Sequence, residues 1–426
     1  MIILNPKNKG KQIYVIKGVI NMSLTQKLRE LNWKRNFAAK RLKLRIEFLF
    51  FSLIRLALPR KIKEYDLSKI KKILIIRNDR IGDMVVTTSL IRNLAKSGYS
   101  VYVVSTKSAL DIVKFNPYVK GTIIYDNSTF LNWIKSIVRV RKESFDAAVE
   151  IKFIRCFDMK NMIFSSYVKT PILIGFNKSS IKSFNLSIPN YLHNSHVTVQ
   201  LKQVLEALNV KYDDMHYEIP VSENIKTNVN SFFKTTADNK KKVAVLNPFG
   251  STVARLLSNK QVNIICNLLS AKYKTIIIGE ENRIKQLNLP DGVSVFNSSS
   301  ILDVVPLIEL SDLVVSVDTS IVHIATCFNK NTIALYADSD PNQPAADKKS
   351  VYHHEFSIFK LTLEDSFYNK DYLKTHSPKI LLPITHCIWA PNNKNAKQLL
   401  FDDDNMSKVD NQIFETKLVN ALETID

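Results

Sequence analysis

The chain has 426 residues and a formal net charge of +21 at pH 7. This length is enough for two sizeable domains and an appended segment, and the hydrophobic content of 45% is ordinary for a globular protein. The four cysteines lie far apart and lack the spacing of a metal or redox motif. They are therefore expected to be reduced thiols in a cytosolic protein.

The positive charge is concentrated at the N-terminus. The first 72 residues hold 19 Lys or Arg against 4 Asp or Glu, a net of +15, which leaves +6 for the other 354 residues. The basic character thus belongs to an extension, residues 1–70, and not to the body of the chain. This distribution argues against a body that binds nucleic acid, because such binding depends on cations that contact phosphates.

A helix is predicted within the extension, over residues 23–59. Ser23 and Gln26 have the spacing of a capping box. A cationic stretch is followed by apolar residues 46–58, which are too few to span a bilayer, because a spanning helix takes about 20 apolar residues. No small-residue cleavage site of a signal peptide follows. A basic helix of this kind suits the surface of an anionic membrane; a helix docked on the body and a nucleic-acid arm are the alternatives.

Residues 71–98 have the strand–loop–helix form that opens a doubly wound α/β domain. The apolar run Ile73–Ile76 predicts a buried strand, and a helix is predicted from Met84 to about Lys96. Asp83 is expected at the N-cap, with its carboxylate facing the crevice. The loop also carries Arg77, Asp79, Arg80 and Gly82, and the glycine would let a ligand approach the backbone. The alternative is a solvated turn followed by an ordinary helix cap.

Strands and helices alternate along the rest of the first half. Strands are predicted at 101–105, 121–125, 147–151 and 171–175, and helices at 130–140 and 196–208. This rhythm is typical of a parallel sheet with helices on both faces. It predicts a domain over residues 71–225, followed by an Asn-, Lys- and Thr-rich connector at about 222–242.

A second α/β series begins at residue 242. Strands are predicted at 243–247, 274–279, 293–296, 313–317 and 332–336, and helices at 259–271, 281–287, 301–309 and 321–328. A second domain is therefore expected over 242–410, with a C-terminal helix in 411–426. Two such domains would face each other across a cleft at the carboxyl ends of their strands.

Two polar stretches follow strands of the second half. Ser251, Thr252 and Arg255 come after the strand 243–247, and their hydroxyl, backbone N–H and guanidinium groups suit a phosphate. Glu280 and Glu281 follow the next strand, where an acidic residue can bind a ribose. A plain turn and a solvated helix start are the alternatives.

A third stretch, Asp318, Thr319 and Ser320, stands where a helix begins after the strand 313–317. Free N–H groups and the helix dipole at such a position favour a phosphate. His323 lies in the first turn of this helix, where a buried core histidine is the alternative. The Asp338–Asp340 pair resembles a metal-binding D-x-D motif but supplies too few oxygen ligands, so no metal site is predicted.

Together, "RNDRIGDMVVTTSLIRNL", "NPFGSTVARLLS" and "SVDTSIVHIATCFNKNTIALY" resemble glycosyltransferase family 9, the bacterial heptosyltransferases of lipopolysaccharide core synthesis. The segment "NSHVTVQLKQVLEAL" is similar to the family's His-led helix before the interdomain linker. Trp389–Pro391 and a helix at 412–422 resemble the family's C-terminal end. The resemblance covers about residues 71–424.

The resemblance implies a GT-B fold of two Rossmann-like domains and an inverting, metal-independent transfer without a cofactor. The donor would be a nucleotide sugar, ADP-heptose in characterised members, and the acceptor a lipid-linked core oligosaccharide. The protein would then work in the cytoplasm, at the inner face of the inner membrane, and the basic helix would contact that surface.

Carried over by position, Asp83 matches the catalytic base, with Arg77, Asp79, Arg80 and Gly82 on the acceptor side. The donor-binding positions would be Ser251, Thr252, Arg255, Glu280, Glu281, Asp318, Thr319, Ser320 and His323. Ser320 stands where many members have Gly. The alternatives are a same-fold transferase that uses another nucleotide sugar for a different surface glycan, and a non-catalytic protein that binds nucleotide sugars or nucleic acid.

Overall fold

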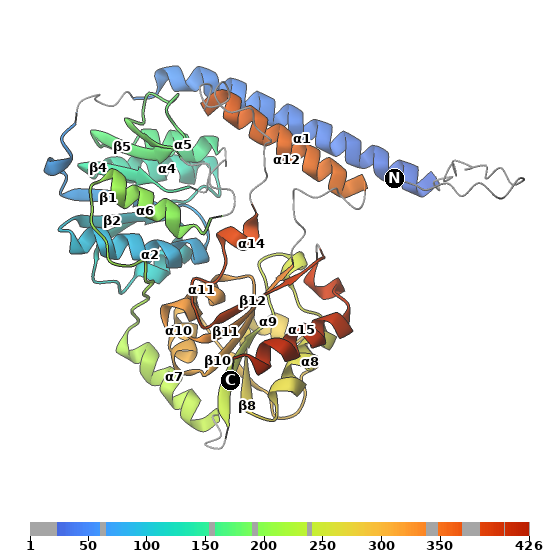
Figure 1. The fold of residues 1–426 in the computed structure, drawn as a ribbon. Coiled ribbons are helices and arrows are strands. Elements are labelled where there is room, and N and C mark those ends of the chain that lie inside the picture. The colour runs from blue at the N-terminus through green and yellow to red at the C-terminus, as the bar shows by residue number, and fades with distance from the viewer. Residues whose placement is uncertain are drawn as a thin grey trace, which may run out of the picture.

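The computed structural model describes residues 24–59, 65–152, 158–189, 195–236, 241–337, 348–368, 384–403 and 405–425. Two parallel six-stranded sheets organise these residues (Figure 1). The strand orders are β3-β2-β1-β4-β5-β6 and β12-β11-β10-β7-β8-β9. Both orders place the first strand of each half in the middle of its sheet, which is the doubly wound arrangement.

The first sheet contains β1 (Lys72–Ile76), β2 (Ser100–Ser105), β3 (Val119–Ile124), β4 (Ala147–Glu150), β5 (Ile172–Phe176) and β6 (Leu186–Ile188). Its helices are α2 (Ile81–Lys96), α3 (Lys107–Leu110), α4 (Phe130–Arg141), α5 (Met159–Ser166) and α6 (Thr198–Ala207). Ile76 pairs with Val104 of β2 and with Glu150 of β4, so the carboxyl ends of these three strands lie level. Residues that follow them must meet at one edge of the sheet.

The side chains of β1 alternate between two buried cores, as the two-residue period of a strand requires. Ile73 and Ile75 pack with α2 and α6. Leu74 and Ile76 pack on the other face, with α1, α4 and α5. Helices therefore cover both faces of the sheet, which explains why β1 is a continuous apolar run.

Helix α1 (Leu24–Ala57) lies along the first half and extends beyond it (Figure 1). Leu44, Phe48 and Phe51 are buried against the core of α4 and α5. The alternative of a helix docked on the body is thus correct for this face of α1. None of the helices formed by the described residues is both long and apolar enough to cross a membrane.

The second sheet contains β7 (Lys242–Asn247), β8 (Tyr273–Gly279), β9 (Ser294–Asn297), β10 (Leu313–Val317), β11 (Asn331–Ala337) and β12 (Ala396–Phe401). Its helices are α8 (Asn259–Leu269), α9 (Glu281–Ile284), α10 (Ile301–Leu310), α11 (Ser320–Cys327), α14 (Thr385–Ile388) and α15 (Asn411–Glu423). One buried cluster contains residues of both halves, for example Met84 of α2 and Ile324 of α11. The two halves therefore meet at an apolar seam.

Two helices lie outside the predicted pattern. The connector contains α7 (Glu223–Thr236), which packs on α10. Helix α12 (Lys348–Tyr368) follows β11 in the chain, yet it lies beside α1 (Figure 1). Arg41 of α1 and Glu355 of α12 form an ion pair at 3.1 Å, and Phe356 packs on the core under α1. A segment of the second half thereby reaches back onto the first.

The GT-B fold class is confirmed by the two facing α/β halves. The predicted strands and helices lie within a few residues of their expected bounds, whereas β6, β12, α3, α5, α7, α12 and α14 were given no bounds from the sequence. The domain boundaries stay predictions. The Asp338–Asp340 pair lies outside the described residues.

The docking of α1 can be tested with two neighbouring phenylalanines. Phe51 is fully buried, whereas Phe50 on the same helix is 52% exposed. Phe51→Ala should lower the free energy of unfolding by about 3–5 kcal/mol, because it removes a ring and leaves a cavity. Phe50→Ala is the matched control and should cost less than about 1 kcal/mol. Equal effects in urea unfolding would show that α1 is not docked through this face in solution.

Candidate active site

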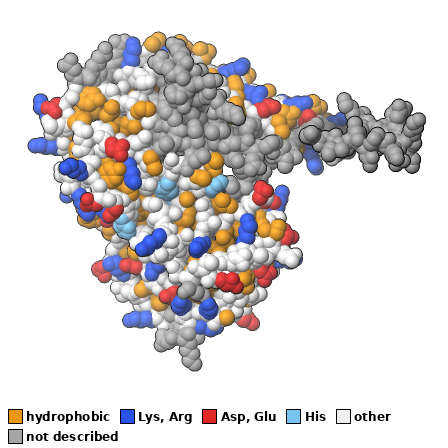
Figure 2. Space-filling model, in the orientation of Figure 1, with side chains coloured by type: hydrophobic (Ala, Val, Ile, Leu, Met, Phe, Trp, Pro, Cys, Tyr) orange, Lys and Arg blue, Asp and Glu red, His pale blue; other side chains and the backbone are white. Residues whose placement is uncertain are grey.

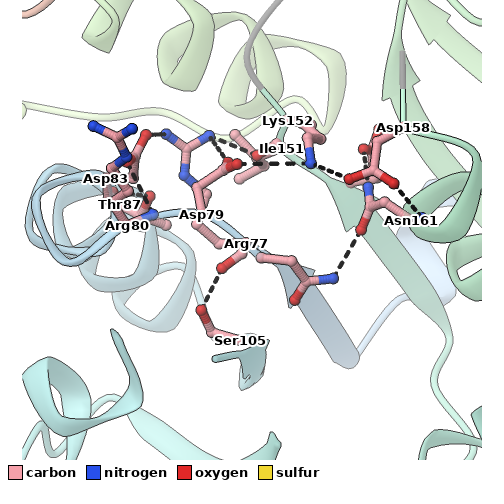
Figure 3. Close-up of polar contacts among 12 residues, drawn as sticks. Arg77, Asp79, Arg80, Asp83, Thr87, Ser105, Ile151, Lys152, Asp158 and Asn161 are labelled. Carbon is pink, nitrogen blue, oxygen red and sulfur yellow. Dashed lines mark hydrogen bonds and ion pairs between the residues drawn. The ribbon is translucent and has the colours of Figure 1, made fainter. Parts of the chain in front are cut away.

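Arg77, the residue after β1, is the centre of a polar cluster (Figure 3). Its side chain is 1% exposed. Nη1 donates to the carbonyl of Ile151 at 2.6 Å, and Nη2 donates to Oδ1 of Asp83 at 2.6 Å. Its own carbonyl accepts from the Ser105 hydroxyl. The guanidinium therefore ties the ends of β1 and β4 to the start of α2.

Asp83 is held at both carboxylate oxygens. Oδ1 accepts from Arg77, and Oδ2 accepts from the backbone N–H of Arg80 at 3.1 Å. The prediction that Asp83 is the N-cap is wrong: α2 begins at Ile81, and Asp83 is the third residue of the helix. From this position its carboxylate can reach back to the N–H of residue 80, as in a capping box.

Asp79 lies in the same cluster and faces two cations. Its carboxylate is 3.4 Å from Nη1 of Arg77 and 3.9 Å from Nζ of Lys152. Burial raises the pKa of Asp79 above its usual value, against the effect of the two cations. Lys152 also pairs with Asp158 at 2.7 Å. Burial alone would raise the pKa of Asp158, but the ion pair with Lys152 lowers it below the usual value.

A second polar chain supports the loop from the side of β4 and β5. Asn78 donates to Asn161, and Asn161 donates to Glu150, which is 1% exposed and pairs with Lys178 at 2.8 Å. Glu150, Lys152, Asp158, Asn161 and Lys178 were not predicted as site residues from the sequence. Glu150 offered a signal, because it is a charged residue at the end of the otherwise apolar strand β4.

Arg255 and Asp318, two residues predicted to bind the donor, meet across two strand ends of the second sheet. Arg255 ends a short 3₁₀ helix, Val253–Arg255, and its Nη2 is 2.9 Å from Oδ2 of Asp318. Burial raises the pKa of Asp318, against the effects of Arg255 and Arg80. Gly250 is required in this loop, because a Cβ there would lie 2.2 Å from Cβ of Arg255.

Thr319 caps α11, as the sequence predicts for this trio. Its hydroxyl accepts from the N–H of Ile321 at 3.3 Å and from the amide of Asn247 at 2.9 Å. Asn247 is thus a further residue that fixes the loop. Ser320 begins α11 and its Cα lies 3.4 Å from the Cβ position of Gly82, so the start of this helix, with its free backbone N–H groups, lies at the seam between the halves.

The two sets of residues come together at the seam. Nη1 of Arg80 donates to the hydroxyl of Ser251 at 3.2 Å. Gly82 lies against α11, because a Cβ at Gly82 would be 3.1 Å from the ring of His323 and 3.4 Å from Cα of Ser320. A Cβ at this position would require the ring of His323 to shift by a few tenths of an ångström, so glycine favours the close approach of α2 and α11.

The remaining predicted residues lie at the margin of the site. Thr252, Glu280 and Glu281 are exposed. Glu281 pairs with Lys285 at 2.7 Å, and the hydrogen bond from Lys285 lowers the pKa of Glu281. Arg283 donates to the carbonyl of Gly250 at 3.3 Å, which places α9 beside the 248–255 loop. The ribose role of the two glutamates stays a prediction.

The arrangement defines a class of protein: a GT-B glycosyltransferase, with Asp83 on the first half and the Arg255–Asp318 pair on the second. Comparisons with known proteins agree. The family described as glycosyltransferase family 9 (heptosyltransferase) matches residues 135–360. The chain therefore belongs to glycosyltransferase family 9 and is a glycosyltransferase.

Individual relatives are distant in sequence. An Escherichia coli (strain K12) protein with the provisional name lipopolysaccharide heptosyltransferase 4 is 24% identical over 325 residues, 74% of this chain and 87% of that protein. A family 9 structure from Veillonella parvula has a TM-score of 0.62 at 13% identity, covering 83% of this chain and 97% of its own. The E. coli ADP-heptose LPS heptosyltransferase II has a TM-score of 0.58 at 15% identity, with 83% and 98% covered.

His323 makes the seam sensitive to pH. Burial lowers the pKa of His323 to about 3, and burial lowers the pKa of His196 to about 4. The unfolded chain takes up these protons near pH 6.5 and the folded chain does not, so stability falls as pH drops below about 6.5. The loss is roughly 2 kcal/mol for each histidine between about pH 7 and pH 5.

His323→Phe should remove its own share of this loss. Urea unfolding of the variant at both pH values should show a pH-dependent decrease about 2 kcal/mol smaller than in the wild-type protein. The free energy of unfolding at neutral pH gives the effect of the substitution on packing, and the change between the two pH values gives the contribution of protonating His323. An unchanged pH dependence would mean that His323 is protonated in the folded protein.

Proposed function

We propose that the protein transfers a heptose from ADP-heptose to a lipid-linked core oligosaccharide of lipopolysaccharide, with inversion and without a metal. The observation that carries this proposal is the position of Asp83 in the first turn of α2, hydrogen-bonded to Arg80 and next to Gly82, the two residues that meet the second half. The donor is supported by membership of family 9 and by the name of the E. coli ADP-heptose LPS heptosyltransferase II. The acceptor is supported by the name of the E. coli relative, a lipopolysaccharide heptosyltransferase.

In the proposed reaction an acceptor hydroxyl attacks the anomeric carbon of the donor sugar. The bond from that carbon to the diphosphate breaks on the opposite face, and Asp83 takes the hydroxyl proton. Each carboxylate oxygen has two lone pairs, so Asp83 can accept a further hydrogen bond beside those from Arg77 and Arg80. These two donors fix its orientation before the acceptor binds, which favours the transfer geometry.

The leaving diphosphate would be met on the second half. Arg255 has a planar guanidinium suited to phosphate oxygens, and the ion pair with Asp318 holds it beside the start of α11. Backbone N–H groups at this start add a favourable dipole. Preorganised hydrogen-bond donors that point at charge developing in the transition state can each lower the activation free energy by roughly 3–4 kcal/mol.

A same-fold transferase with another nucleotide sugar is the second candidate. The observation that favours it is Ser320, whose Cα lies 3.4 Å from the Cβ position of Gly82 and whose side chain narrows the seam. Wild-type turnover with a UDP- or GDP-sugar, and none with ADP-heptose, would select this candidate.

Asp83→Asn tests the catalytic role. The variant should bind ADP-heptose nearly as the wild-type protein does in calorimetry, because the amide oxygen can still accept from Arg77. Its kcat, followed by ADP release, should fall by about 10²–10⁴-fold, because an amide cannot take the proton. Wild-type kcat would show that Asp83 only stabilises the start of α2.

We also propose that α1 holds the protein at the cytoplasmic face of the inner membrane. Its exposed face carries an apolar stripe, defined here as Leu24, Leu28, Leu31, Leu42, Ile46, Leu49, Phe50, Leu53 and Leu56, each 52–74% exposed. At 100° per residue this stripe lies on the side opposite Phe37, Leu44, Phe48 and Phe51, which are buried. Figure 2 shows hydrophobic side chains together with Lys and Arg along the projecting arm.

The stripe has the length and flanks of an interfacial helix. A helix of 34 residues is about 51 Å long. Cations flank the stripe on both sides, with Lys27, Lys34 and Arg45 on one side and Arg29 and Lys43 on the other, and Arg35 interrupts it between Leu31 and Leu42. An apolar face bordered by Lys and Arg binds anionic membranes.

Leu49→Ser combined with Leu53→Ser should weaken co-sedimentation with anionic vesicles about tenfold or more, because less apolar area enters the lipid. Leu131→Ser with Ile413→Ser is the matched control, since these two residues are also exposed but lie elsewhere. Equal binding of both double variants would contradict docking through the stripe. Self-association of the full chain that is lost in the stripe variant would assign the stripe to a second copy instead.

A further inference from the structure

A groove of about 460 Å³ runs between α1 and α12, far from the seam. Three cations of α1 line it: Lys34, Arg41 and Arg45. Phe37 and Leu42 of α1 and Tyr352 of α12 supply apolar walls. The groove therefore combines a row of positive charge with an apolar lining, and the proposed glycosyl transfer uses none of it.

The position of the groove relates it to the apolar stripe. Lys34, Arg41 and Arg45 are spaced by seven and four residues, so they lie on one side of α1. This side lies between the buried face of α1 and the stripe, and Leu42 belongs to both the stripe and the groove. If the stripe faces the acyl chains, the groove opens just above them, at the depth of the lipid headgroups.

The cations of the groove are only partly neutralised. Glu355 pairs with Arg41 at 3.1 Å, and Glu30 pairs with Lys34 at 3.2 Å. The guanidinium of Arg45 lies over the ring of Phe359, 5.2 Å from its centre, a contact that does not neutralise its charge. The buried Nε of Arg41 has no hydrogen-bond partner in the described part of the chain. The groove therefore has positive charge and hydrogen-bond donors that remain available to an anion.

We propose that this groove seats the phosphate headgroup of an anionic membrane phospholipid, whose acyl chains lie along the stripe. The inference rests on the proposed membrane docking of α1. Arg binds phosphate through a rigid fork, and its charge-assisted hydrogen bonds are stronger than diffuse attraction to a charged surface. Tyr352 suits the same depth, because it has an apolar ring with a polar end.

The headgroup site would be shared by both halves of the protein. Arg41 and Arg45 come from the helix that packs on the first half, whereas Tyr352 and Glu355 come from the segment that follows β11. A lipid in the groove contacts both helices and so adds to the interactions that hold α12 against α1.

Two double variants that remove the same charge from α1 separate a headgroup site from diffuse attraction. Lys34→Gln with Arg45→Gln alters the groove and leaves the Arg41–Glu355 pair intact. Lys27→Gln with Lys43→Gln is the control, because both residues are exposed and lie outside the groove. Binding of each full-length variant is measured by co-sedimentation with vesicles of phosphatidylcholine and phosphatidylglycerol in equal parts.

The groove variant should lose at least about tenfold more affinity than the control, with unchanged melting temperature and unchanged activity on a soluble acceptor. Equal losses would overturn the headgroup site and leave membrane docking in place. Absence of vesicle binding by the wild-type protein would overturn both proposals. The protein could also be displaced from vesicles by inorganic phosphate but not by chloride at equal ionic strength. That result would assign the groove to free phosphate and overturn its assignment to a lipid headgroup.

Discussion

The buried guanidinium of Arg77 is the constraint on which the first half of the site depends. A charge that is 1% exposed is stable only when paired and hydrogen-bonded. Its partners are Ile151 after β4, Asp79 in the loop and Asp83 in α2. Loss of one partner would leave an uncompensated charge, so the three elements must keep their relative positions. The orientation of Asp83 follows from this requirement.

The sequence predicted those parts of the fold in which burial alone sets the pattern. β1, β7 and β10 are buried on both faces, so they appear as continuous apolar runs. Helix α7 has a largely polar composition, and of its residues only Val229 is fully buried, which is a weak local signal. The position of α12 beside α1 depends on contacts between residues some 300 positions apart, which no local pattern contains.

The site was likewise predictable where its residues directly follow a buried strand, and not where it depends on contacts between distant segments. Asp83 and Asp318 follow predicted strands, and the carboxyl ends of parallel strands meet at one edge of a sheet. Asp83 was misplaced by three positions, because the loop after Arg77 turns into a helix earlier than its charges suggest. Lys152 and Asn161 could not be found, because their roles depend on the level ends of β1 and β4. The Arg255–Asp318 pair likewise joins two strands that are separated in sequence.

If α1 binds a membrane surface as proposed, its two apolar faces would link that surface to the cleft. Phe48 and Phe51 fix α1 to the sheet whose strand β1 precedes the helix with Asp83. Helix α12 packs on α1, and α14 follows it in the chain. Ala390, just after α14, accepts a hydrogen bond at its carbonyl from His196 of the first half, at 3.1 Å. A membrane that orients α1 would therefore orient the first half directly and the second half through α12. For an acceptor confined to the same surface, a fixed orientation of the cleft would raise the effective concentration of acceptor at Asp83.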